Sequence, residues 1–148
     1  MRLFIICMLV FSTPILANNR VKIDVVKVTD GDTVKAIFNG ETINIRLSYI
    51  DCYETRDNKR AYWQAEYYHK SLGDVIKQGK QSKEILRQLI DRNYNNIYMI
   101  AKGRDKYRRT LGELFLGKDG ESINEYMLQN GKCEKYEDRK KQKIIDRF

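Results

Sequence analysis

Long apolar runs, histidine, proline and internal repeats are scarce or missing in this chain of 148 residues. After the first seventeen residues no stretch is long and apolar enough to cross a bilayer, which argues against an integral membrane protein. A single histidine, His69, argues against chemistry built on imidazole, and a single proline, Pro14, leaves residues 18–148 without one. The whole chain is 42% hydrophobic, with ten Tyr, five Phe and one Trp, which suits one globular domain with its own core.

The first seventeen residues differ in composition from the rest of the chain. Arg2 is their only charge, residues 3–11 form an apolar run, and Ala17 ends the segment with a small side chain. This composition is typical of a secretory signal peptide, so we expect residues 1–17 to be removed and residues 18–148 to act in the periplasm or outside the cell. Retention of the segment as an uncleaved anchor is the alternative.

Basic residues outnumber acidic residues. The chain carries 28 Lys and Arg against 20 Asp and Glu, a net charge of +8, and loss of residues 1–17 would remove only Arg2 and leave +7. A basic exported domain favours polyanionic partners such as nucleic acids. Solubility alone would also explain an excess of this size.

Two cysteines, Cys52 and Cys133, remain after the predicted signal peptide. An even number of cysteines in an oxidising compartment permits a disulfide bond. The sequence does not show that the two residues meet, and two separate thiols are the equal alternative.

Three segments rich in β-branched residues follow the predicted signal peptide, at 21–28, 33–38 and 42–47. Asp30-Gly31 and Asn39-Gly40 separate them, and Asn-Gly is a strong signal for a type I′ hairpin turn. The pattern predicts three consecutive antiparallel strands. In the third strand, Arg46 alternates with apolar residues and therefore points away from the apolar face: Ile43, Ile45 and Leu47.

The rest of the chain predicts two more strands, at 97–101 and 110–116, and two helices. Ser82 is placed to cap the first helix, and the spacing of Ser122 and Glu125 is that of a capping box for the second. Residues 51–79 show no clean strand periodicity, and we expect a long connecting segment that contains a helical turn or two. Five strands in this order favour a Greek-key β-barrel of the OB type with two to three helices, an all-β or α+β fold.

Three short segments concentrate charged residues at the ends of predicted strands: Asp30-Gly-Asp-Thr33, Arg46 followed by Asp51-Cys-Tyr-Glu54, and Asp105-Lys-Tyr-Arg-Arg109. Together they resemble the thermonuclease, or staphylococcal nuclease-like, family. The pattern of that family is a DGDT turn, an arginine before a D-T-P-E-T loop, and a D-x-Y-G-R strand entry. Each motif is weak alone, but three in this order are specific.

The resemblance implies a calcium-dependent nuclease that acts on DNA and RNA and leaves 3′-phosphate products. We also expect a preference for single strands and a monomeric protein. Calcium prefers hard oxygen ligands. By resemblance these would be the carboxylates of Asp32 and Asp51 and the backbone carbonyl of Cys52. Asp30 would contribute from outside the ligand set, although aspartates in such turns also serve turn formation alone.

The same motifs imply the residues that act on the phosphate. Glu54 falls at the position of the proposed general base, and Arg46 and Arg109 would bind the phosphate from two sides, which suits the planar fork of a guanidinium. Lys106 and Tyr107 fall where the family contacts a terminal phosphate, and we assign them to substrate binding. The ordinary alternatives are that Glu54 is a surface glutamate and that Arg46 and Arg109 are exposed arginines in ion pairs.

The sequence departs from the family in two of the three motifs. Cys52-Tyr53 replaces Thr-Pro, so the predicted calcium loop loses a rigid φ and we expect weaker metal affinity. Arg108 replaces the glycine before Arg109, which adds a positive charge where the turn favours a positive φ. We expect both changes to affect the rate more than the type of reaction.

The stretch 56–79 is longer than in the best-known family members and interleaves aromatic rings with basic residues: Tyr62, Trp63, Tyr67 and Tyr68. Such a pattern suits stacking on single-stranded bases, and packing of the rings onto the barrel is the alternative that we favour.

Two other functions compete with a nuclease. One is a catalytically weak or inactive OB-fold module that only binds single-stranded nucleic acid, and the other is a secreted domain that recognises protein or acidic glycan. The second would explain the charge but not the ordered motifs. An enzyme is favoured because the acids and arginines of all three motifs are retained: Asp32, Arg46, Asp51, Glu54 and Arg109.

Overall fold

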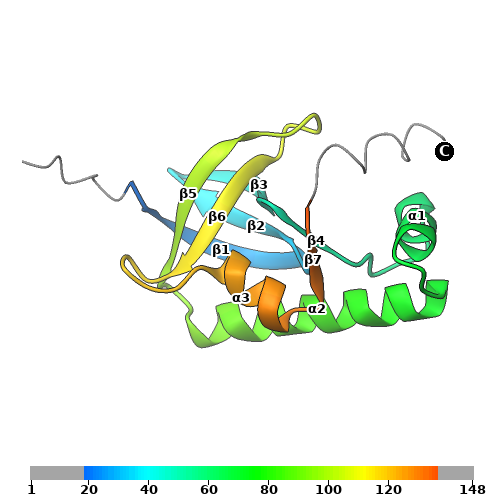
Figure 1. The fold of residues 1–148 in the computed structure, drawn as a ribbon. Coiled ribbons are helices and arrows are strands. Elements are labelled where there is room, and N and C mark those ends of the chain that lie inside the picture. The colour runs from blue at the N-terminus through cyan, green and yellow to red at the C-terminus, as the bar shows by residue number, and fades with distance from the viewer. Residues whose placement is uncertain (1–18, 137–148) are drawn as a thin grey trace, which may run out of the picture.

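Five strands form a closed barrel in the computed structural model, which describes residues 19–136 (Figure 1). They are β1 (Val21–Asp30), β2 (Thr33–Phe38), β3 (Glu41–Leu47), β5 (Ile97–Arg104) and β6 (Thr110–Leu116). Their order around the barrel is β1-β2-β3-β6-β5, and all neighbours are antiparallel except β3 and β6. The predicted five-stranded barrel of the OB type is therefore confirmed, and the predicted signal peptide at 1–17 lies outside the described residues.

The hairpin between β2 and β3 has the predicted turn. Asn39 and Gly40 both take positive φ, 51° and 79°, as a type I′ turn requires. The register that follows buries Ile45 and Leu47 and leaves Arg46 on the other face of β3. The turn and the alternation together place the arginine outside the barrel core.

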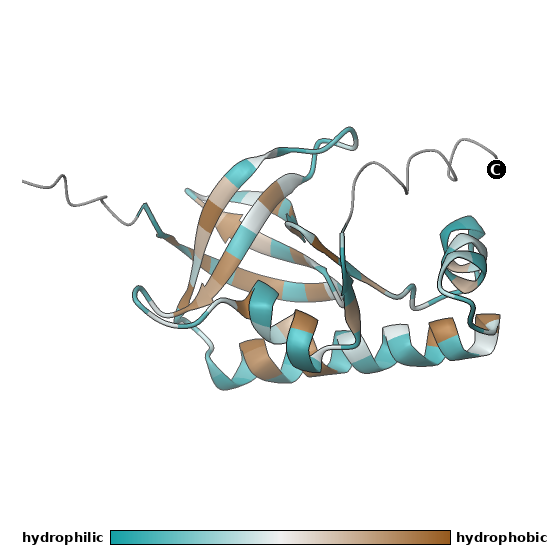
Figure 2. Cartoon of the chain, viewed as in Figure 1, coloured by the Kyte–Doolittle hydropathy of each residue, from teal (hydrophilic) through white to brown (hydrophobic). Residues whose placement is uncertain are grey.

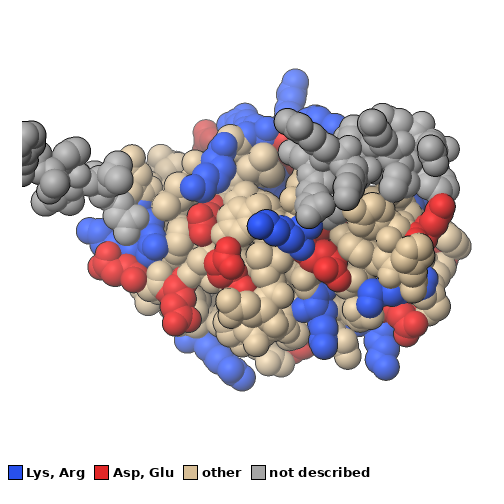
Figure 3. Space-filling view, viewed as in Figure 1, with Lys and Arg blue, Asp and Glu red and all other residues tan. Residues whose placement is uncertain are grey.

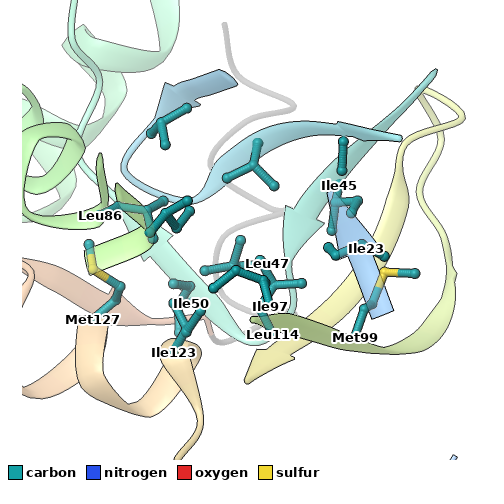
Figure 4. Close-up of a cluster of buried hydrophobic side chains, with 14 of the residues drawn as sticks. Ile23, Ile45, Leu47, Ile50, Leu86, Ile97, Met99, Leu114, Ile123 and Met127 are labelled. Carbon is teal, nitrogen blue, oxygen red and sulfur yellow. The ribbon is translucent and has the colours of Figure 1, made fainter. Parts of the chain in front are cut away.

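The core fills the barrel and continues between the barrel and two of the helices (Figure 4). β-branched and leucine side chains from every barrel strand contribute to it, as expected for inward-facing positions on half-buried strands. Leu86 comes from the long helix and Met127 from the last one. The largest fully buried members are Ile23, Ile45, Leu47, Ile50, Leu86, Ile97, Leu114, Ile123 and Met127.

The long helix α2 (Leu72–Arg92) runs beneath the barrel and extends past it toward α1 (Figure 1). Apolar residues recur among hydrophilic ones along α2, as in an amphipathic helix (Figure 2). The prediction that Ser82 caps this helix is wrong, because Ser71 is the N-cap and its Oγ accepts a hydrogen bond from the Asp74 N–H at 3.0 Å. Ser82 lies inside the helix and donates to the Gln78 carbonyl.

The long connecting segment predicted at 51–79 is largely helical, which corrects that prediction. Helix α1 (Lys59–Tyr67) begins at Asn58, whose side chain accepts from the Ala61 N–H at 2.9 Å. Trp63, Tyr67 and Tyr68 pack against each other and α2, and not onto the barrel as favoured from the sequence. Tyr62 is 54% exposed. Trp63 stacks on Tyr67 with 5.0 Å between ring centroids. A second small core forms there, separate from the barrel: Tyr53, Ala61 and Val75, with Ala65, Tyr68 and Leu72 against them.

Helix α3 (Ile123–Asn130) begins as predicted, with Ser122 as N-cap accepting from the Glu125 N–H. The side chain of Asn124 is completely buried. Its Oδ1 accepts from the Leu114 N–H at 3.0 Å, and its Nδ2 donates to the Ser48 carbonyl at 3.0 Å. This amide ties α3 to β6 and to the end of β3.

Two short strands form a second, antiparallel sheet beside the barrel: β4 (Ile50–Cys52) and β7 (Cys133–Lys135). Cys52 lies opposite Cys133, and the two form a disulfide, which settles the pairing that the sequence left open. None of the described helices is long and apolar enough to cross a membrane.

Candidate active site

A cleft of about 1030 Å³ lies where the three charged motifs meet. The β1–β2 turn, the end of β3, the residues after β4, helix α1 and the β5–β6 loop all contribute to its wall. The predicted site residues that line it are Asp32, Arg46, Cys52, Glu54, Lys106, Tyr107 and Arg109. Lysine and arginine are mixed with acidic side chains on the face shown in Figure 3. The described residues on that face thus do not form one broad basic patch.

Asp32 and Asp51 converge on the guanidinium of Arg46. Arg46 Nη1 lies 2.6 Å from Asp32 Oδ2, and Arg46 Nη2 lies 3.3 Å from Asp51 Oδ1. Burial opposes the charge on Arg46, but the two carboxylates outweigh it and raise the pKa of the guanidinium. Residues from two separate chain segments, the β1–β2 turn and β4, are therefore held at one point.

The backbone joins the same two segments. The Cys52 N–H donates to Asp32 Oδ2 at 2.9 Å, so the Asp32 carboxylate accepts from both the Arg46 side chain and β4. Thr33 Oγ1 donates to the other oxygen, Oδ1, at 3.0 Å. Asp30, the expected outer contributor, accepts instead from Thr55 Oγ1 at 3.0 Å.

Glu54 lies at the start of the loop between β4 and α1, with its side chain about one-quarter exposed at 24%. Asn58 Nδ2 donates to Glu54 Oε2 at 2.9 Å, and Arg60 Nε lies 3.4 Å from Oε1. Burial raises the pKa of Glu54, against the opposing effects of the Asn58 hydrogen bond and the Arg60 charge. A carboxylate with a raised pKa is a better proton acceptor at neutral pH than an ordinary glutamate.

Arg109 enters the cleft from the β5–β6 loop and is held by Asp105. Its Nε donates to Asp105 Oδ2 at 2.7 Å, and its backbone N–H donates to Oδ1 at 2.9 Å. Burial would raise the pKa of Asp105, but these hydrogen bonds and the Arg109 charge lower it. Arg109 is thus ion-paired, as the ordinary alternative suggested, yet it also lines the cleft.

The turn before Arg109 carries the strain expected from the sequence. Arg108 takes φ 62°, the left-handed region that a glycine would adopt at less cost. Lys106 and Tyr107 precede it in the cleft wall, and Tyr107 is 68% exposed. An exposed ring next to two arginines suits contact with a nucleotide.

Helix α1 adds residues that the motifs did not indicate. Arg60 Nη2 lies 2.5 Å from Asp51 Oδ1, so Asp51 contacts two guanidinium groups and its side chain is only 1% exposed. The Gln64 side chain bonds the backbone on both sides of Tyr53. Neither contact could be predicted from the sequence, because residues 51–79 show no helical stripe that would place these side chains.

The oxygen donors suit a hard divalent cation. Two carboxylates that reach one guanidinium also lie close to one another, and the Cys52 N–H donates to Asp32, which brings Cys52 next to the carboxylates. Within residues 19–136 no group of three or more His, Cys, Asp and Glu side chains is arranged to hold a metal. The ligand set implied by the family resemblance needs only two carboxylates and a carbonyl, so the donor chemistry fits calcium.

Gly79 of α2 packs directly behind Glu54. A Cβ at this position would overlap the Glu54 carbonyl oxygen and lie 2.6 Å from the Tyr53 carbonyl oxygen. We expect Gly79→Ala to destabilise the fold by about 1–3 kcal/mol in urea unfolding, because backbone must move to admit the methyl group. The loop that carries Glu54 would shift, so nuclease activity should fall as well.

Gly73 provides the matched control in the same helix. A Cβ there meets only Ser71 Oγ, at 3.9 Å. Gly73→Ala should therefore stabilise the protein by about 0.5 kcal/mol through helix propensity and leave activity unchanged. Equal effects of the two substitutions would contradict the close packing of α2 on the Glu54 loop.

Comparison with known proteins finds similarity to nucleases. The family model described as staphylococcal nuclease homologue matches residues 44–147. An uncharacterized endonuclease of Haemophilus influenzae is 31% identical over 108 residues, which cover 72% of this chain and 48% of that protein. An uncharacterized endonuclease of Escherichia coli is 27% identical over 128 residues, 86% of this chain and 69% of that protein.

A third relative, endonuclease YncB of Bacillus subtilis, is 29% identical over 122 residues, 80% of this chain and 51% of that protein. The chain thus spans about half the length of the Haemophilus and Bacillus relatives.

Proposed function

The chain belongs to the staphylococcal nuclease family, and from this membership we propose that it is an exported, calcium-dependent nuclease that cleaves DNA and RNA. The observation that carries the proposal is the convergence of Asp32 and Asp51 on Arg46. Asp32 and Arg46 line the cleft together with Glu54 and Arg109, whereas Asp51 is buried and does not line it. Acids for a cation, a base and two phosphate-binding arginines therefore meet in one place.

The two arginines are prepared differently for a phosphate. Arg46 is fixed by Asp32 and Asp51, so it is already oriented in the cleft before substrate binds. Arg109 uses its Nε to bind Asp105, and its Nη atoms form no hydrogen bond to another residue within 19–136. Those Nη donors are available to phosphate oxygens, where a planar guanidinium binds two oxygens at once.

Glu54 supplies the base. It takes a proton from water, the water oxygen attacks phosphorus, and the bond from phosphorus to the 5′ oxygen breaks. The leaving oxygen takes up a proton, so the products are a 3′-phosphate and a 5′-hydroxyl. Negative charge builds on the phosphoryl oxygens during attack, where Arg46 and Arg109 neutralise it.

Asp32, Asp51 and the Cys52 carbonyl would hold the calcium ion. Calcium would supply positive charge for the phosphoryl oxygens and lower the pKa of a bound water. The Cys52–Cys133 disulfide supports the proposed export, because disulfides persist mainly in oxidising compartments.

Digestion of labelled single-stranded DNA and RNA by the purified protein with calcium tests this function. We expect cleavage of both, and products that shift on a gel after removal of a 3′-phosphate by phosphatase. Binding of the strands without cleavage would instead identify an inactive OB-fold module. Products that carry a 5′-phosphate would contradict the proposed bond breakage.

A further inference from the structure

Gln64 is a completely buried polar residue in contact with the candidate metal loop. Its side chain is 0% exposed, on the face of α1 that meets the residues after β4. Its Oε1 accepts from the Glu54 N–H at 2.8 Å, and its Nε2 donates to the Cys52 carbonyl at 3.0 Å. One amide therefore spans Tyr53 and bonds the backbone on both sides of it.

The place of this amide in the loop is chemically specific. The Cys52 carbonyl is the backbone ligand that the proposed function assigns to calcium, and Glu54 is the proposed base. A carbonyl oxygen has two lone pairs, so the bond from Gln64 leaves one for a cation and fixes the direction in which the carbonyl points. The bond to the Glu54 N–H fixes the backbone from which the base projects.

The loop needs such a restraint because it lacks a proline. Tyr53 occupies the position at which the family pattern has proline, so no ring fixes its φ. Tyr53 is itself buried, and Lys70 and Tyr68 contact its ring. A buried amide whose donor and acceptor are both satisfied is costly to displace. The Gln64 amide can therefore restrain the loop in place of a proline ring.

Helix α1 is in turn held in place, so that Gln64 has little freedom. Asn58 caps its first turn and also donates to Glu54 Oε2 at 2.9 Å. Trp63, next to Gln64, is buried against Tyr67 and Tyr68. The segment that is longer than in the best-known family members thus contacts both the backbone and the side chain of Glu54.

We propose that Gln64 is a positioning residue, which orients the Cys52 carbonyl toward the cation and holds the backbone of Glu54 in place of the absent proline. This inference rests on the proposed function and names a residue outside the three motifs. It predicts that loss of the Gln64 amide lowers the affinity for calcium in addition to lowering the stability of the fold.

Calcium titration by calorimetry on purified wild type and Gln64→Met tests the inference. Methionine has a similar volume but neither donates nor accepts as the amide does. Residues that orient metal ligands typically affect affinity or activity by about 10- to 100-fold, and we expect a loss in that range for calcium affinity, with a lower kcat. Should Gln64→Met fail to fold, Gln64→Asn keeps a buried amide too short to span both backbone groups, and the same loss is expected.

Asn124→Leu is the matched control. Asn124 is also completely buried and also bonds backbone at both ends, but its hydrogen bonds go to Ser48, Gly112 and Leu114 and not to residues 51–54. Its substitution should lower Tm as Gln64→Met does and leave the calcium Kd unchanged.

Two results would overturn the inference, and they are distinguishable. If Gln64→Met lowers Tm but binds calcium and turns over as wild type does, Gln64 has only a structural role, and the proposed nuclease stands. If wild type itself binds no calcium, the proposed metal dependence fails and the inference fails with it.

Discussion

Arg109→Ala is expected to lower kcat for cleavage of single-stranded DNA by about 10²- to 10³-fold, the usual loss when one donor to a developing oxyanion is removed. Asp105 holds the Arg109 side chain in the cleft wall at 2.7 Å, so the guanidinium needs no rearrangement to meet a phosphate. Arg109→Lys should recover little, because an ammonium lacks the planar fork. Steady-state cleavage of a fluorescent oligonucleotide gives both kcat and KM.

Arg87→Ala is the control for this substitution. Arg87 is also an arginine paired with an aspartate four residues away, Asp91, but it lies on the exposed side of α2 and not in the cleft. Its removal should leave kcat unchanged. An Arg109→Ala variant that is as active as Arg87→Ala would show that Arg109 is merely an ion-paired surface residue.

Glu54→Gln is expected to lower kcat by about 10²- to 10⁴-fold, the range for loss of a general base. Glutamine keeps the shape of the side chain and can still accept the Asn58 hydrogen bond, so the loop should remain folded. The substitution removes proton acceptance and the negative charge that faces Arg60. Substrate affinity, measured by binding of a labelled strand, should change much less than kcat.

Glu66→Gln on the exposed surface of α1 serves as the comparison, since it removes the same charge from the helix that follows the Glu54 loop. We expect wild-type activity from it. Full activity of Glu54→Gln would assign the base to another group and reduce Glu54 to a surface residue.

The barrel was predictable because its signals are local. Alternation along β2 and β3 and the Asn39-Gly40 turn act within a few residues, and the structure follows both. The strands β4 and β7 are three residues long, too short to show a period, and the start of α2 carries only Val75 and Gly79 on its buried stripe. With so few apolar residues on its buried face, the start of this helix shows no helical periodicity in the sequence.

The candidate site likewise combines contacts that the sequence predicts with contacts that depend on tertiary packing. The three motifs predicted that Asp32, Asp51 and Arg46 lie together, and the structure places both carboxylates on the guanidinium. The contacts of Arg60 and Gln64 depend on how α1 packs, which no pattern in residues 56–79 expressed. The pairing of Cys52 with Cys133 is likewise a product of the tertiary fold, because 81 positions separate them.

The most direct test of the account is the initial rate of single-strand cleavage by the wild-type protein as a function of free calcium, set with chelator buffers. If Asp32 and Asp51 hold a catalytic cation, the rate should be negligible in excess chelator, rise with calcium to a plateau, and return fully when calcium is restored. A rate in excess chelator equal to that at saturating calcium would contradict the account.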